Sequence, residues 1–238
     1  MPVALKADGV TVRFGGVTAV NNISLSVPAG GILGLIGPNG AGKTTLFNAI
    51  TGFVPAQSGS VSLFGETVSG LPAYERTRRG MGRTFQTARP FEELTVLENV
   101  LVAAFLRAPR RADAEAAAMK ALEQVGLADR HDQAAADLNL ARLRRLELAK
   151  ALAVQPRILF LDEIMAGLNP PALKETMAVV RGLTEQGLAV VMVEHIMEAI
   201  IGLCDHVLVL ASGNLIAEGA PQTVVSDERV IEAYLGTD

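Results

Sequence analysis

The sequence predicts an α/β fold with a parallel sheet, and three observations support this prediction. Residues 31–36, 157–161 and 188–193 are strand candidates that, apart from Arg157, are apolar and have the length of buried strands. The first of them runs directly into the glycine-rich loop of residues 37–45, which satisfies the pattern GxxxxGK[ST] between a strand and a helix. Helical segments separate the predicted strands, and such alternation is typical of a parallel sheet.

The N-terminal elements are short strands separated by turns. Residues 9–14, 23–27 and 59–64 carry this pattern, and the helix after the glycine-rich loop interrupts it from about Lys43. We therefore expect a small β-rich layer that leads into the α/β core.

The middle of the chain is predicted to be helical from about residue 87 to residue 155. Ala118, Leu122 and Val125 recur at i, i+4 and i+7, so they share one helix face, and Gly126 is a stop signal. We interpret this block as a helical insertion. The strand pattern then returns, with a helix initiated by Pro170 and a last strand at residues 206–210.

Composition limits the class of protein. The chain is 50% hydrophobic with a mean hydropathy of +0.33, yet no uninterrupted apolar run approaches the ~18 residues of a membrane span. Its start lacks the apolar region of a signal peptide and its single cysteine, Cys204, cannot form an internal disulfide, so we expect a reducing cytoplasm. A net charge of −4 and a pI near 5.5 argue against nucleic acid as the main partner.

The glycine-rich loop predicts a site for a nucleoside triphosphate. Its glycines let backbone N–H groups point at phosphates, and the next helix adds its positive N-terminal end. Lys43 is expected to pair with the β- and γ-phosphates, and the Thr44 hydroxyl to bind Mg²⁺. The alternative is a turn that only joins a strand to a helix. The predicted nucleotide-binding residues are Gly37, Pro38, Asn39, Gly40, Ala41, Gly42, Lys43, Thr44 and Thr45.

Polar residues follow two further predicted strands at their carboxyl ends, where the sites of α/β proteins form. Asp162 is expected to hold Mg²⁺, and Glu163 to orient and deprotonate the attacking water. His195 is expected beside the γ-phosphate. Gln86, where the core gives way to the helical block, is expected to touch Mg²⁺ and the water. Taken alone, each of these residues has a structural alternative: two acids in a solvated turn, or a histidine that only packs.

Five motifs, in order, resemble the ATP-binding cassette (ABC) family: the loop at residues 37–45, Gln86, the Asp162–Glu163 pair, residues 167–170, and His195. The resemblance implies a P-loop ATPase (RecA-like) core with an N-terminal antiparallel β layer and an inserted α-helical subdomain. It implies a single domain over residues 1–238, with residues 87–155 as the helical subdomain and residues 1–86 and 156–238 as the β layer and core. By the same resemblance, Phe14 falls where an aromatic ring stacks on adenine, although it could be an ordinary core residue.

The resemblance also implies ATP hydrolysis with Mg²⁺ by a homo- or heterodimer of cassette subunits. Such a dimer binds membrane permease subunits and lies peripherally on the cytoplasmic face of the inner membrane. Five segments are similar to those of cassettes for branched-chain amino acid uptake: residues 45–52, 82–86, 94–100, 166–170 and 230–236. Such cassettes work together with a solute-binding protein. The alternatives are urea or amide uptake, lipopolysaccharide export, a non-transport ABC ATPase such as a translation factor, and a P-loop kinase.

The chain departs from the family at the signature, usually close to LSGGQ. In the family this segment grips the γ-phosphate held by the opposite subunit, so a bulkier signature should hinder that approach. Ile164 and Ile196 also replace a usual proline and a frequent acid. Residues 87–99 are expected to contact a permease helix. The signature falls on Leu138, Asn139, Leu140, Ala141 and Arg142.

Overall fold

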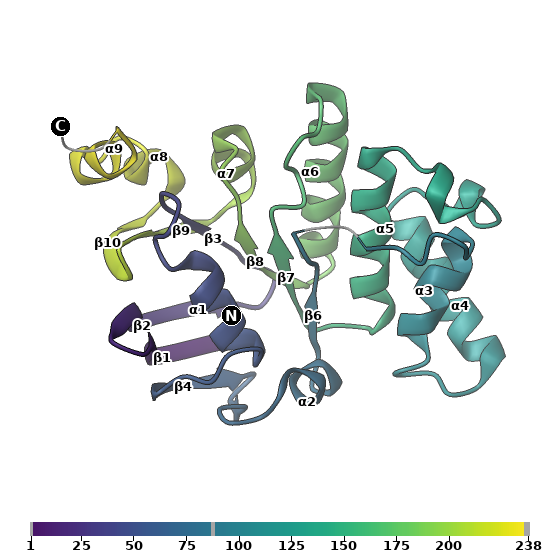
Figure 1. Ribbon diagram of the computed structural model, residues 1–238. Helices are drawn as coiled ribbons and strands as arrows, with labels where there is room; N and C mark the ends of the chain where they lie inside the picture. The colour runs from purple at the N-terminus through teal and green to yellow at the C-terminus, as the bar shows by residue number, and fades with distance from the viewer. Residues whose placement is uncertain (1, 87–88, 236–238) are drawn as a thin grey trace.

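The computed structural model describes residues 2–86 and 89–235, which form two sheets with helices around them (Figure 1). Residues 1, 87–88 and 236–238 lie outside the described residues. The expected start of the helical subdomain at residue 87 therefore also lies outside them, and the division into subdomains stays a prediction.

The first sheet is antiparallel, with the strand order β2-β1-β4-β5. Along β2, buried Ile23, Leu25 and Val27 alternate with exposed residues, so one face of the sheet packs on the core and the other faces solvent. The predicted N-terminal antiparallel layer is therefore confirmed. Its strands are β1 (Val3–Phe14), β2 (Val17–Pro28), β4 (Ser58–Leu63) and β5 (Glu66–Thr67).

The second sheet has six strands in the order β10-β9-β3-β8-β7-β6, all parallel to their neighbours except the β9–β10 pair. Every residue of β3, β7 and β8 is buried, as expected for strands that are covered on both faces. The strands are β3 (Ile32–Ile36), β6 (Met81–Arg83), β7 (Ile158–Asp162), β8 (Ala189–Val193), β9 (His206–Ala211) and β10 (Asn214–Gly219).

Two strands of this sheet were not predicted from the sequence. The strand β6 has three residues, too few for a periodic pattern, and β10 is an edge strand with one buried residue, Ala217. Tertiary pairing creates both strands.

The helices lie around the sheets, and α3, α4 and α5 pack together beside the β6 edge (Figure 1). Ala118, Leu122 and Val125 are buried as predicted, and Gly126 follows α4 at a φ of +68°. No helix in the described residues is long and apolar enough to cross a membrane. The helices are α1 (Lys43–Thr51), α2 (Ala73–Arg78), α3 (Val96–Ala104), α4 (Arg111–Gln124), α5 (Leu140–Ala153), α6 (Pro170–Glu185), α7 (Met197–Leu203), α8 (Pro221–Val224) and α9 (Glu228–Leu235).

Candidate functional site

Sheet register brings the predicted site segments to one edge. In the parallel sheet β8 lies between β3 and β7, and Val193 of β8 pairs with both Leu35 of β3 and Asp162 of β7. The glycine-rich loop, Glu163 and His195 therefore leave the sheet at the same level. This is the carboxyl edge of the strands, where α/β proteins bind ligands.

The backbone of the glycine-rich loop lies so close to neighbouring backbone atoms that a side chain would not fit at two of its positions. A Cβ on Gly37 would lie 2.0 Å from the carbonyl oxygen of Leu210, and one on Gly42 would lie 2.4 Å from that of Ala19. The Lys43 ammonium donates to the carbonyl oxygens of Gly37 (2.6 Å) and Pro38 (2.9 Å). Burial lowers the pKa of Lys43, and the charge of Glu163 opposes that shift. A cation thus lies over the loop where phosphate oxygens can take the place of the two carbonyls.

The C-terminal helix also reaches this loop. The hydroxyl of Tyr234, in α9, accepts a hydrogen bond of 2.8 Å from the N–H of Gly37. Sequence reasoning did not assign a role to Tyr234, because the contact joins residues that lie far apart in the chain. The tyrosine therefore contacts the first residue of the loop, whose carbonyl oxygen accepts from Lys43.

The two predicted catalytic residues after β6 and β7 are in contact. The amide of Gln86 donates to a carboxylate oxygen of Glu163 at 2.8 Å. Glu163 adopts a φ of +51°, uncommon for a residue with a side chain, and its N–H donates to the carbonyl oxygen of Val193. A strained conformation held by neighbouring strands is frequent at functional positions.

The three predicted metal ligands line one cavity. Thr44, Gln86 and Asp162 border a groove of about 690 Å³. Asp162 is 4% exposed, and burial raises its pKa while the guanidinium of Arg83 opposes the shift. Among residues 2–86 and 89–235, no group of three or more His, Cys, Asp or Glu side chains is placed to hold a metal ion. One carboxylate, one hydroxyl and one amide fit Mg²⁺, which binds few protein ligands and completes its shell with phosphate and water.

The other two predicted contacts lie at the surface. His195 is exposed just after β8. Phe14 is 54% exposed at the end of β1, so the alternative that it is an ordinary core residue does not describe it. The next strand, β2, meets the glycine-rich loop at Ala19, beside Gly42.

The segment predicted to be the signature forms the start of α5. The side-chain oxygen of Asn139 accepts from the N–H of Arg142 at 3.0 Å and so caps this helix. Leu140 is 45% exposed, and its side chain reaches Gly167, where an added Cβ would lie 3.2 Å away. A half-exposed leucine side chain therefore stands at a position where the predicted signature would have glycine.

One acidic residue of the site was missed because a glutamate before a histidine carries no distinctive pattern. Glu194 is 1% exposed, and one carboxylate oxygen accepts from the N–H of Met165 at 3.0 Å. The other oxygen has no hydrogen-bond partner among the described residues. Burial raises the pKa of Glu194 to about 7. The residue thus connects the loop before His195 to the loop after Glu163.

Glu194→Gln is expected to remove a pH dependence of stability. From pH 4.5, its ordinary pKa, to about 7, the unfolded chain has released this proton while the folded chain retains it. The free energy of unfolding of the native chain should therefore fall by about 3 kcal/mol over this range. The variant should lack that fall in urea titrations at several pH values. Glu185→Gln, at an exposed position, is the control, and parallel pH curves for Glu194→Gln and the native chain would contradict the expectation.

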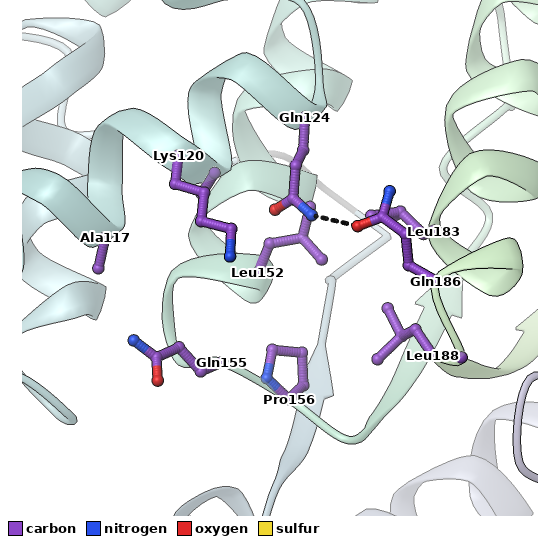
Figure 2. Close-up of a pocket in the computed structure, with 11 residues that line it drawn as sticks. Ala117, Lys120, Gln124, Leu152, Gln155, Pro156, Leu183, Gln186 and Leu188 are labelled. Carbon is purple, nitrogen blue, oxygen red and sulfur yellow. Dashed lines mark hydrogen bonds between the residues drawn. The ribbon is translucent and has the colours of Figure 1, made fainter.

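A second cavity lies near the amino ends of the parallel strands, away from the glycine-rich loop (Figure 2). It measures about 410 Å³, and a hydrogen bond of 3.4 Å from Gln124 to Gln186 crosses its border. Pro156 and Leu188, which line it, precede β7 and β8, so it lies at the amino ends of the strands. This cavity is therefore separate from the predicted nucleotide site.

Comparisons with known proteins agree with this geometry. The model of the ABC transporter family matches residues 20–166, and that of the branched-chain amino acid ATP-binding cassette transporter matches residues 214–238. The high-affinity branched-chain amino acid transport ATP-binding proteins BraF of Pseudomonas aeruginosa and LivG of Escherichia coli are each 40% identical, over 98% of this chain and 97% of theirs. The lipopolysaccharide export ATP-binding protein LptB of Escherichia coli is 34% identical, over 98% of both chains.

Solved structures give the same result. A nucleotide-free ATP-binding cassette from an ABC transporter superposes with a TM-score of 0.91 at 30% identity, covering 99% of this chain and 100% of that one. An ATP-binding cassette of an ABC transporter in its ADP conformation also gives 0.91 at 30% identity, with full coverage of both chains. The predicted α/β P-loop fold is confirmed.

Proposed function

This chain belongs to the ABC transporter family, as an ATPase, and we propose that it powers the uptake of branched-chain amino acids. The observation that carries the proposal is 40% identity over nearly the whole chain to two branched-chain amino acid transport subunits, while the export protein LptB is 34% identical. The match over residues 214–238 to the branched-chain model supports the same choice.

In the proposed reaction, Glu163 takes a proton from the water that attacks the γ-phosphate. The hydrogen bond from Gln86 keeps the Glu163 carboxylate in one orientation. Lys43 and His195 contact the γ-phosphate from the glycine-rich loop and from β8. Mg²⁺, when bound by Thr44, Asp162 and Gln86, neutralises charge on the phosphates. Phe14 offers its exposed ring to adenine.

The proposed partners are a second cassette subunit and membrane permease subunits, with a solute-binding protein acting through the permease. We place the chain peripherally on the cytoplasmic face of the inner membrane. Phe53, Phe85 and Lys150 line the same groove as Thr44 and Asp162, and we assign this groove to a permease segment. Residues 87–155 would form the subdomain on one side of this groove.

Co-purification tests this assignment. The tagged chain, extracted from native membranes with mild detergent, is expected to bring down permease subunits. The solute-binding protein associated with them should bind leucine and should not bind urea. Recovery of lipid-export components, or of soluble proteins alone, would reject the proposal.

The altered signature leads to a further expectation about rate. In a dimer each ATP lies between one glycine-rich loop and the other subunit's signature, so Leu140 and Ala141 face the partner's ATP. We expect a fast site built on Lys43 and Glu163 and a slow site at the partner's loop. Restoring Ser and two glycines at residues 139–141 should speed the slow site in single-turnover measurements on the complex.

A matched control leaves the helix unchanged. Asn139→Ser alone keeps an N-cap but retains the two bulkier side chains, so it should not speed the slow site. The asymmetric assignment is wrong if replacing the partner's catalytic glutamate halves the rate instead of leaving it nearly intact.

A further inference from the structure

Arg83, the last residue of β6, is a largely buried cation with several partners. Its side chain is 11% exposed, and the guanidinium pairs with the Asp162 carboxylate at 3.2 Å. It also donates to the side-chain oxygens of Asn48 (2.7 Å) and Thr51 (2.9 Å), both in α1. These contacts fix the guanidinium between the helix that follows the glycine-rich loop and the strand that carries the proposed metal ligand.

Three aromatic rings surround the same guanidinium. Its central carbon lies 4.7 Å from the ring centre of Phe47, 4.8 Å from that of Phe53 and 5.1 Å from that of Phe85. Phe47 is buried, but Phe53 and Phe85 are 52% and 47% exposed and pack edge to face on one another at 5.8 Å. Two rings that hold a buried cation are therefore accessible from outside the molecule.

The groove connects these two environments. The exposed rings of Phe53 and Phe85 line it together with Thr44 and Asp162, and Arg83 lies between them. A segment packed on the rings would restrict their rotation, and the stacked guanidinium would lose freedom with them. Because Asp162 pairs with that guanidinium, the orientation of its carboxylate depends on the rings.

We propose that Arg83 is a positioning residue that links Phe53 and Phe85, at the surface of the groove, to the Asp162 carboxylate. It orients that carboxylate toward Mg²⁺, and it makes the orientation sensitive to whatever occupies the groove. The planar fork of arginine is needed, because it hydrogen-bonds in its plane while its faces stack on rings. The identity of the occupant, a permease segment, rests on the proposed function, whereas the link itself lies within this chain.

Arg83→Lys tests the link in the isolated full-length chain. The affinity for a fluorescent ATP analogue is measured in EDTA and in excess Mg²⁺. Lysine keeps the charge but loses the fork and the stacking, so the gain in affinity that Mg²⁺ gives should fall about tenfold while the affinity in EDTA changes little. Arg79→Lys, which alters an arginine paired with exposed Glu66 and with Glu75, is the matched control and should change neither affinity.

Phe53→Leu provides a second variant that alters only a half-exposed ring. It should lower the Mg²⁺-dependent gain about threefold, and the Phe53→Leu, Arg83→Lys double variant should be no worse than Arg83→Lys alone, because both changes break one link. Full additivity of the two effects would overturn the proposal. So would an equal loss of affinity with and without Mg²⁺, which would indicate a structural role only.

The two proposals fail in different ways. If no permease binds this chain, the affinities in the isolated chain can still follow the pattern expected for the link. If the link is wrong, permease subunits still co-purify with Arg83→Lys while the Mg²⁺-dependent gain stays at the native level.

Discussion

Glu163→Gln is expected to lower ATP turnover of the assembled transporter by about 10²- to 10⁴-fold, the usual contribution of a general base. An amide has nearly the shape of a carboxylate but does not accept the proton of the attacking water. ATP should bind at least as tightly as before, because the change removes one negative charge near the phosphates. Steady-state phosphate release and a titration with a fluorescent ATP analogue measure the two properties separately.

The structure explains why this substitution should leave the site folded. The Glu163 backbone N–H bonds to Val193, and a glutamine side chain still offers an oxygen to the Gln86 amide. Glu185→Gln, the same chemical change at the exposed end of α6, is the control and should have native turnover. A Glu163→Gln complex that hydrolyses ATP within a few-fold of the native rate would remove Glu163 from the mechanism.

The second large effect is expected for Lys43→Ala, which should weaken ATP binding by about 100-fold. Hydrogen bonds to charged groups contribute about 1.5–3 kcal/mol each, and the Lys43 ammonium has donors for more than one phosphate oxygen. The free chain already directs two of these donors to the Gly37 and Pro38 carbonyls at the surface where phosphates would lie. Titration of the isolated chain with the fluorescent analogue gives the affinity.

Lys120→Ala supplies the matched control for this experiment. Lys120 borders the cavity near the amino ends of the strands (Figure 2). This substitution therefore removes the same charge at a position away from the glycine-rich loop. Thermal unfolding without nucleotide checks that Lys43→Ala remains folded. Equal affinities for the native chain and Lys43→Ala would exclude the loop as the phosphate site.

The core and the phosphate loop could be predicted because their residues are locally distinctive. The strands β3, β7 and β8 are uninterrupted apolar runs, and the loop after β3 has glycines that its backbone requires at Gly37 and Gly42. Asp162 and Glu163 were found because they follow such a strand. In these segments local sequence and tertiary structure favour the same conformation.

The remaining parts depend on contacts between distant residues. Arg83 lies three residues before Gln86, yet only folding brings it to Asp162, Phe47 and Phe53. Tyr234 meets Gly37 across nearly the whole chain. Glu194 becomes notable only through its burial. The strand β6 forms because it pairs with β7, and the sequence of its residues has no periodic pattern that would predict a strand.

The most direct test of the account is ATP-driven uptake in proteoliposomes that contain this chain, its partner cassette and its permease subunits, with ATP inside and a solute-binding protein outside. Leucine should accumulate and should stimulate ATP hydrolysis, and both should be lost with Glu163→Gln but not with Glu185→Gln. Stimulation by urea or by lipopolysaccharide without stimulation by leucine would contradict the proposed substrate. ATP hydrolysis that no solute changes would contradict a role in uptake.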